Sequence, residues 1–151
     1  MRTHHHVLPS RAGAGHLALD EAELRQWGID LGASSEPPLV ISLSGDLGAG
    51  KTTLAQSICL GYGVTEPVTS PTYALVHRYD APKSPVFHID LYRLDKESDL
   101  TNIGWDEIIV ERALVIVEWP ERAGNHMPAG HLHIDLQYAA GDSSRRVLLA
   151  G

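Results

Sequence analysis

Apolar positions along the chain fall into short runs that alternate with polar and glycine-rich stretches. The run at 16–19 predicts a short strand, and Asp20 after it is a candidate N-cap for a helix. The helix-spaced apolar residues that follow are Leu24, Trp27 and Leu31. Their i, i+3, i+7 spacing indicates one buried face of an amphipathic helix, which we expect Gly32 to end.

The run at 39–43 is almost continuously apolar and partly β-branched. Such a run is typical of a central strand that is covered on both faces. A glycine-rich loop follows directly, and the stretch 51–60 predicts a helix closed by Gly61 and Gly63. The order is therefore strand, glycine loop, helix.

Later runs predict more strands and one short helix. The predicted strands are 72–79, 86–91, 114–118, 131–136 and 146–149, and the predicted helix is 105–110. The last two strands alternate with period two and are expected to be antiparallel. Few long helices join the strands, and short loops cannot join parallel neighbours. We therefore expect an α/β fold of three layers, with a mixed central sheet between two helical layers.

A chain of 151 residues suits one domain, which we place at 16–151. Residues 1–15 lack periodicity and include three consecutive histidines, and we expect them to form a mobile N-terminal tail. The tail could bind a metal ion, but no further ligand at a fixed spacing supports such a site.

The charge balance is 12 basic against 19 acidic residues, or −7. This balance argues against a free-standing binder of nucleic acid or of anionic membranes, which depend on Lys and Arg. The single cysteine, Cys59, excludes an intrachain disulfide and fits a reducing compartment. No apolar run approaches the ~20 residues that span a bilayer. We expect a cytoplasmic protein that makes no membrane contact.

The glycine loop fits the phosphate-loop (P-loop) pattern G-x-x-x-x-G-K-[ST], which chance would produce on the order of 0.3% of the time in this composition. The predicted ATP-binding residues are Gly45, Asp46, Leu47, Gly48, Ala49, Gly50, Lys51, Thr52 and Thr53. Backbone N–H groups would bind phosphate oxygens, Lys51 would reach the β- and γ-phosphates, and Thr52 would ligate Mg²⁺. The alternative is a glycine-rich turn with an exposed lysine.

Two acids stand at the ends of apolar strands. Glu118 could bind Mg²⁺ directly or through water, or orient the attacking water; the alternative is an acid that faces solvent. Asp90 shares one face of its strand with His88 and Tyr92. For Asp90 the alternative is an ion pair, for which Arg93 is the candidate partner.

A short Ser/Thr/Pro loop lies 17 residues after Thr52. Its residues are Thr69, Ser70, Pro71, Thr72 and Tyr73. A loop of this kind could act as a switch that senses the γ-phosphate and Mg²⁺. The alternative is a turn before the next strand.

Taken in order, the segments GDLGAGKTT, TSPTY, HIDLYR and VEWPERAG resemble the TsaE family, formerly called YjeE. The resemblance covers about residues 17–150 and implies a P-loop NTPase-like fold whose sheet order differs from that of P-loop GTPases. It also implies an ATPase that works with TsaB and TsaD to form N6-threonylcarbamoyladenosine at position 37 of tRNAs that read ANN codons. ATP hydrolysis would reset the TsaB–TsaD heterodimer, and tRNA would be contacted only through the complex.

The resemblance also implies roles for single residues. Thr52 and Glu118 would hold Mg²⁺, Asp90 would be the essential acid near the metal or the attacking water, and residues 69–73 would form the first switch. Lys51, Asp90 and Glu118 are thus the expected catalytic residues. At a position in the first helix where the family often has threonine near the adenine, this chain has Leu24, so no base contact is carried over.

Two other functions remain open at this point. A small-molecule kinase uses the same loop but normally adds a basic lid, and the arginines of this chain are scattered. A nucleotide-controlled binding module with negligible turnover is the second alternative.

Overall fold

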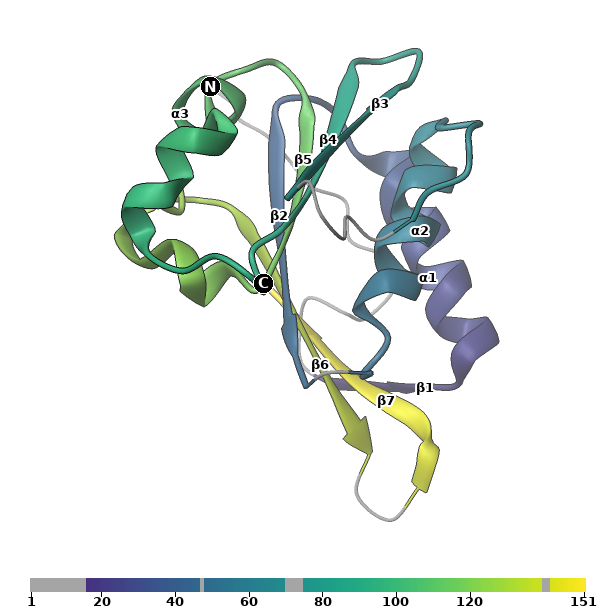
Figure 1. The fold of residues 1–151 in the computed structure, drawn as a ribbon. Helices are drawn as coiled ribbons and strands as arrows, with labels where there is room; N and C mark the ends of the chain where they lie inside the picture. The colour runs from purple at the N-terminus through teal and green to yellow at the C-terminus, as the bar shows by residue number, and fades with distance from the viewer. Residues whose placement is uncertain (1–15, 47, 70–74, 140–141) are drawn as a thin grey trace.

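A computed structural model describes residues 16–46, 48–69, 75–139 and 142–151 (Figure 1). The strands are β1 (His16–Leu19), β2 (Leu39–Gly45), β3 (Val76–Asp80), β4 (Pro85–Asp90), β5 (Leu114–Glu118), β6 (Leu132–Ala139) and β7 (Asp142–Ala150). The helices are α1 (Glu21–Ser34), α2 (Lys51–Tyr62) and α3 (Trp105–Ile109), with 3-10 helices η2 (Glu97–Ile103) and η3 (Pro120–His126). The predicted tail at 1–15 lies outside the described residues.

The strands form one mixed sheet in the order β1-β7-β6-β2-β5-β4-β3. β2 pairs in parallel with β5 and with β6, and β4 pairs in parallel with β5. The other three pairs, β1–β7, β3–β4 and β6–β7, are antiparallel. The prediction of a mixed sheet is confirmed, although β6 has one parallel and one antiparallel neighbour.

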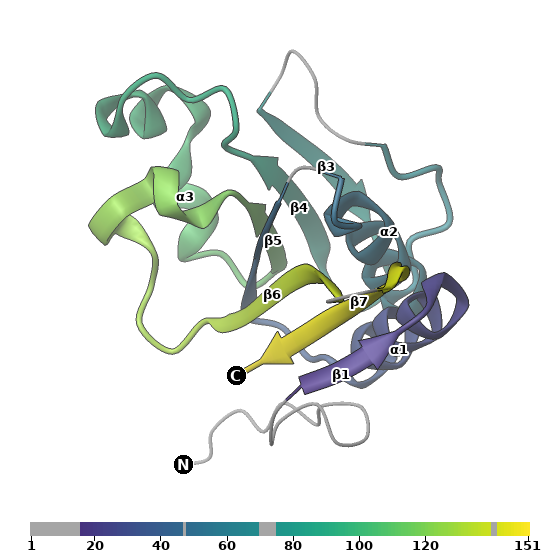
Figure 2. The ribbon, with the colours of Figure 1, turned by 90° about the horizontal axis from the view of Figure 1, so that it is seen from below.

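Helical layers cover both faces of the sheet. α1 and α2 lie on one face, and α3 with the two 3-10 helices lies on the other (Figure 2). Ile41 and Leu43 on β2 belong to the core cluster that α1 and α2 cover, whereas Val115 and Val117 on β5 belong to the second cluster. β5 is buried at every position, as expected for a strand between two layers.

The predicted start of α1 is confirmed in detail. The Asp20 side chain accepts a hydrogen bond from the Glu23 backbone N–H, and the Glu23 side chain accepts one from the Asp20 backbone N–H. This reciprocal capping satisfies two N–H groups that would otherwise have no partner at the helix start. Leu24, Trp27 and Leu31 are buried, as their spacing predicts.

The predicted helix ends at Gly32 and at Leu60 are wrong, because glycines that serve packing resembled helix stops, whereas the predicted closure of the second helix by Gly63 is confirmed. α1 continues through Gly32 to Ser34, and α2 continues through Gly61 to Tyr62, where Gly63 caps it with a φ of 109°. A Cβ atom on Gly32 would lie 2.1 Å from the Ile58 carbonyl oxygen, and one on Gly61 would lie 2.0 Å from the Ile29 carbonyl oxygen. These glycines let α1 and α2 touch backbone to backbone.

Other predicted bounds shift slightly. The strand predicted at 72–79 begins at Val76 and ends at Asp80, and its first three predicted residues lie outside the described part of the chain. η2 was not predicted, because a short 3-10 helix has no long apolar repeat. Within the described residues, no helix combines the length and the apolar character needed to cross a bilayer.

Candidate functional site

The carboxyl ends of three adjacent strands meet at one edge of the sheet. β5 lies between β2 and β4, so that Glu118 is opposite Leu43 on one side and Asp90 on the other. The glycine loop leaves the same end of β2. The sheet order therefore brings the loop and both predicted acids together, which is the usual place for a ligand in open α/β sheets.

The loop backbone adopts conformations that favour glycine. Gly48 and Gly50 have φ values of 81° and 104°, in the left-handed region, and Gly50 directly precedes α2. At Gly45, a Cβ atom would lie 2.0 Å from the Leu136 carbonyl oxygen on β6. The loop is thus held close to β6 and leads into a helix N-terminus, a geometry suited to binding an anion. Leu47 lies outside the described residues.

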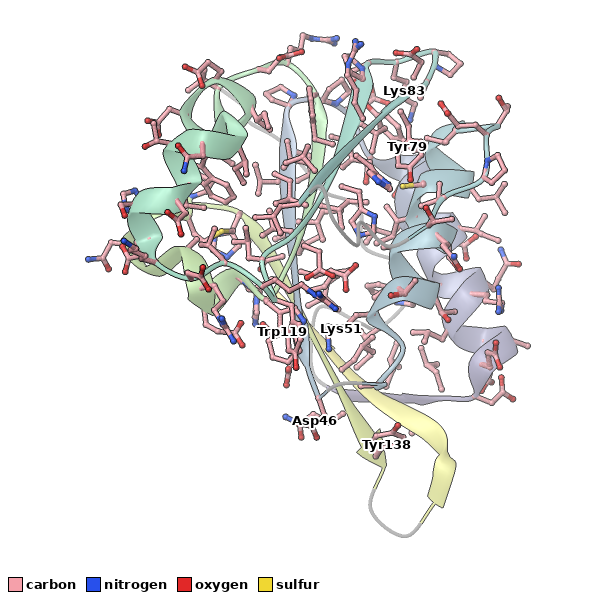
Figure 3. The ribbon with its side chains drawn as sticks, in the orientation of Figure 1. Asp46, Lys51, Tyr79, Lys83, Trp119 and Tyr138 are labelled. Atoms are coloured by element: carbon pink, nitrogen blue, oxygen red, sulfur yellow. The ribbon has the colours of Figure 1, made fainter. Side chains whose placement is uncertain are left out.

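Lys51 is buried with its ammonium group turned back along the loop. Its Nζ donates hydrogen bonds to the Gly45 and Asp46 carbonyl oxygens, at 2.7 and 2.9 Å. It also lies 4.5 Å from the centre of the Trp119 ring (Figure 3). Burial lowers the pKa of Lys51, and Glu118 and Asp90 oppose this by favouring the charged form. The alternative of an exposed lysine on a plain turn is wrong.

A cavity of about 340 Å³ opens beside these groups. Its lining residues are Gly48, Gly50, Lys51, Thr52, Thr53, Asp90, Tyr92, Glu118 and Trp119. Seven of these nine were predicted as site residues from the sequence. The predicted loop residues, the Lys51 cation and the two strand-end acids thus share one concave site.

The acids in the cavity are desolvated. Burial raises the pKa of Asp90, and the nearby Glu118 raises it further, while a hydrogen bond from the Tyr92 N–H to Asp90 Oδ1 (3.0 Å) lowers it. No ion pair joins Asp90 to Arg93 in the described part of the chain, so the ion-pair alternative is wrong. A carboxyl group with a perturbed pKa in a cleft, such as Asp90, is typical of a functional site.

Glu118 is only 3% exposed, which excludes an acid that faces bulk solvent. Within the described residues, no group of three or more His, Cys, Asp or Glu side chains could hold a metal ion unaided. Mg²⁺ is usually bound by one or two carboxylates together with phosphate oxygens and waters. The donor set of Thr52, Glu118 and Asp90 fits that mode of binding.

Trp119 follows Glu118 with a φ of 60°, an uncommon conformation for a bulky residue. Its ring packs against the Tyr92 ring, with the two centroids 5.0 Å apart. The Arg122 guanidinium in turn lies 5.8 Å from the centre of the Tyr92 ring. The structure places Trp119 at the site.

Tyr138 was missed by the sequence reasoning. It comes from β6, and its hydroxyl donates a 2.9 Å hydrogen bond to the Gly48 carbonyl oxygen. No local pattern could reveal this contact, because 90 residues separate the two positions. Leu24 also lies close to the loop. A Cβ atom placed on Gly50 would be only 3.3 Å from Leu24 Cδ2.

Of the predicted switch, only Thr69 is described. Its backbone N and O atoms lie 3.3 and 3.4 Å from the Tyr79 hydroxyl on β3, which also lies 3.2 Å from His77 Nδ1. The other predicted switch residues, Ser70, Pro71, Thr72 and Tyr73, lie outside the described residues. The role of this loop stays a prediction.

The family model "Threonylcarbamoyl adenosine biosynthesis protein TsaE" matches residues 18–147. The chain belongs to the TsaE family. The match extends from β1 to β7 and includes the glycine loop, Asp90 and Glu118. The resemblance to the TsaE family that the four sequence segments suggested is therefore confirmed.

Individual TsaE relatives are similar to this chain over most of their lengths. The "tRNA threonylcarbamoyladenosine biosynthesis protein TsaE" of Nostoc sp. is 38% identical over 130 residues, covering 84% of this chain and 78% of the relative. The protein of the same name from Treponema pallidum is 34% identical over 125 residues, covering 83% and 91%. The crystal structure of Bacillus subtilis YdiB superposes with a TM-score of 0.74 at 27% identity, covering 90% of this chain and 85% of that one.

Proposed function

We propose that this protein is a Mg²⁺-dependent ATPase, slow by itself, that acts with TsaB and TsaD in forming N6-threonylcarbamoyladenosine at position 37 of tRNAs that read ANN codons. Membership of a family named for threonylcarbamoyladenosine biosynthesis supports the pathway. The ATPase part rests mainly on one observation, which is that the glycine loop, Lys51 and two acids line a single cavity.

The loop and Lys51 would bind the triphosphate. The left-handed backbone at Gly48 and Gly50 and the start of α2 favour an anion, and the dipole of α2 adds to this preference. Lys51 is already desolvated, so its interaction with a phosphate would be stronger than in water. The Thr52 hydroxyl and Glu118 would hold Mg²⁺, which neutralises charge on the phosphate oxygens when it is bound.

Asp90 would act on the attacking water. Its raised pKa makes it a better proton acceptor than an exposed aspartate, and the hydrogen bond from the Tyr92 N–H fixes one of its oxygens. The other oxygen is left to orient a water molecule. The half-covered cavity contains no basic lid of the kind that a kinase uses, because Lys51 is its only lysine or arginine among the described lining residues.

Replacing Lys51 tests nucleotide binding. Lys51→Ala should lower ATP affinity about tenfold to a hundredfold, since hydrogen bonds to a charged group contribute about 1.5–3 kcal/mol. Lys83→Ala is a matched control, because Lys83 also donates to two carbonyl oxygens (Ala33 and Ser35) and lies over an aromatic ring (Tyr62) away from the cavity. Calorimetric titration with ATP measures both. Equal affinities of Lys51→Ala and the parent protein would refute a phosphate-binding loop.

Replacing the acids separates binding from turnover. Asp90→Asn should keep ATP affinity and lose about a hundredfold or more in the rate of phosphate release, as expected for a general base. Glu118→Gln should weaken ATP binding in Mg²⁺ but not in EDTA. A normal rate in Asp90→Asn would remove Asp90 from the chemistry. ATP binding without any turnover in the parent protein would favour the nucleotide-controlled binding module.

Adding the partners tests the pathway assignment. Purified TsaB–TsaD should bind the protein in a nucleotide-dependent way and raise its rate of ATP hydrolysis. The measurement is phosphate release with and without the heterodimer, together with threonylcarbamoyladenosine formed over several turnovers. If the heterodimer changes neither phosphate release nor the amount of threonylcarbamoyladenosine formed, the partner assignment fails, even if the protein hydrolyses ATP.

A further inference from the structure

His88 is a fully buried histidine that contacts one of the site acids. It lies on β4, two residues before Asp90, with 0% exposure. Its Nε2 atom is 2.6 Å from Glu118 Oε2, and the Glu118 side chain is 4% exposed. His88 is opposite Ile116 on β5, so it and Glu118 are diagonal neighbours on one face of the sheet.

The surroundings of His88 determine where its proton lies. Its Nδ1 atom is buried and has no hydrogen-bond partner among the described residues. A buried N–H donor without a partner is rarer than a buried acceptor without one. The proton is therefore assigned to Nε2, where it is donated to Glu118 Oε2, and Nδ1 carries only a lone pair.

We propose that His88 is a positioning residue that holds one oxygen of Glu118 and thereby directs the other toward the cavity for Mg²⁺. This inference rests on the proposed Mg²⁺ role of Glu118. A hydrogen-bonded partner behind a metal-binding side chain fixes its orientation, and its loss typically lowers metal affinity or activity about 10–100-fold.

Two polar variants of similar size test the proposal. The glutamine amide of His88→Gln can reach the position of Nε2, whereas the shorter side chain of His88→Asn cannot. His133→Asn is the control, because His133 is a sheet histidine whose Nδ1 lies 2.6 Å from Ser42 Oγ and whose contacts include no acid of the site. ATP affinity is measured by calorimetry in Mg²⁺ and in EDTA, and turnover by phosphate release.

In His88→Asn, we expect the gain in ATP affinity that Mg²⁺ provides to fall about tenfold or more, and kcat to fall about tenfold or more as well. The affinity for ATP in EDTA should be unchanged within about twofold. His88→Gln should retain most of both, and the control should match the parent protein. Equal behaviour of the glutamine and asparagine variants would overturn the proposal. So would a loss in EDTA as large as that in Mg²⁺, since a general structural role would produce it.

A measurement on the unmodified protein keeps the proposal testable if both variants fold poorly. Nitrogen-15 NMR of the histidine rings should show a proton on Nε2 of His88 and none on Nδ1. An Nδ1–H tautomer would overturn the proposal. The two claims also fail differently: absence of any Mg²⁺ effect on ATP binding in the parent protein refutes the proposed function and this inference together, whereas a normal Mg²⁺ effect in His88→Asn refutes only this inference.

Discussion

At the carboxyl end of β4, Asp90 carries a charge that its surroundings disfavour. Burial and the neighbouring Glu118 raise its pKa, and the hydrogen bond from the Tyr92 N–H offsets this only in part. Lys51, whose own pKa is lowered by burial, is the cation that faces the two acids. Such an arrangement reduces folding stability, and proteins commonly retain it where the groups bind or react.

Removing the charge of Asp90 should therefore stabilise the protein at neutral pH. The folded-state pKa lies above the ordinary value of 3.8, so the stability associated with protonated Asp90 is complete at low pH and is lost as the pH rises through the folded-state pKa. Asp90→Asn should melt at a higher temperature than the parent protein at about pH 7.5, and the difference should shrink toward about pH 4. Thermal unfolding followed by circular dichroism measures this.

The control is Asp80→Asn, since Asp80 is exposed and its ion pair with Arg78 is at 3.6 Å on the surface. Surface pairs contribute about 0–1 kcal/mol, so no gain in stability is expected there. A melting difference for Asp90→Asn that is independent of pH would contradict the link to ionisation.

Among the elements, α1 and α2 are fitted to each other by glycine. Gly28, Gly32 and Gly61 lie inside helices, where glycine is intrinsically unfavourable by about 1 kcal/mol relative to alanine. Their Cβ atoms would meet Ser57, Ile58 and Ile29 respectively at distances that real side chains do not adopt. Close packing of the two helices therefore outweighs helix propensity, and it fixes the position of α2, which begins directly after the glycine loop.

Gly32→Ala should consequently destabilise the protein, although alanine has a higher helix propensity than glycine. The methyl group would overlap the Ile58 carbonyl oxygen, and overpacking of this kind costs typically about 1–3 kcal/mol. Ala33→Gly, at the exposed next position of the same helix, should cost about 1 kcal/mol from propensity alone. Urea unfolding compares the two variants. Stabilisation by Gly32→Ala would show that the helices can move apart at no cost.

Over the whole molecule, the negative charge is unevenly distributed. The stretch 88–111 has seven acids against two bases, and it includes η2 and α3 on the face opposite α1 and α2. Asp106, Glu107 and Glu111 are exposed, and Val110 beside them is 81% exposed. Surfaces that bind tRNA are basic. The acidic stretch of this protein, which belongs to a tRNA-modification pathway, would therefore suit contact with a basic surface on a partner.

Neutralising part of this stretch should slow association with the proposed partner, the TsaB–TsaD heterodimer. Glu107→Gln with Glu111→Gln avoids Glu97 and Asp99, which contact His126 and the Lys96 N–H. The association rate should fall several-fold at low salt and converge with that of the parent protein at high salt, where charges are screened.

The control pair, which removes the same charge, is Glu21→Gln with Asp30→Asn on α1; these acids make only surface contacts, with Arg25 and Gln26, on the opposite face of the sheet. Surface plasmon resonance at two salt concentrations distinguishes the pairs. Equal effects of the two double variants would mean that net charge matters, and not its location.

Much of the fold could be predicted from local patterns. The strand Leu114–Glu118 was predicted with its observed bounds, because its continuous, partly β-branched apolar run ends at an acid. The glycine loop could be recognised because its glycines, lysine and threonine lie within one short segment. Gly32 and Gly61 resemble helix ends in the sequence, because their packing roles depend on segments distant along the chain.

Residue order along the chain determined which groups are available: a glycine-rich loop with the phosphate-binding pattern, a lysine beside it, and two strands that each end in an acid. Local backbone preferences and apolar periodicity act over a few residues, so one segment carries enough information to reveal them. Only the tertiary structure decided that β5 lies between β2 and β4, that Glu118 contacts His88, and that Tyr138 holds Gly48. Those contacts join residues 30 and 90 positions apart, and their distances follow from sheet order and register.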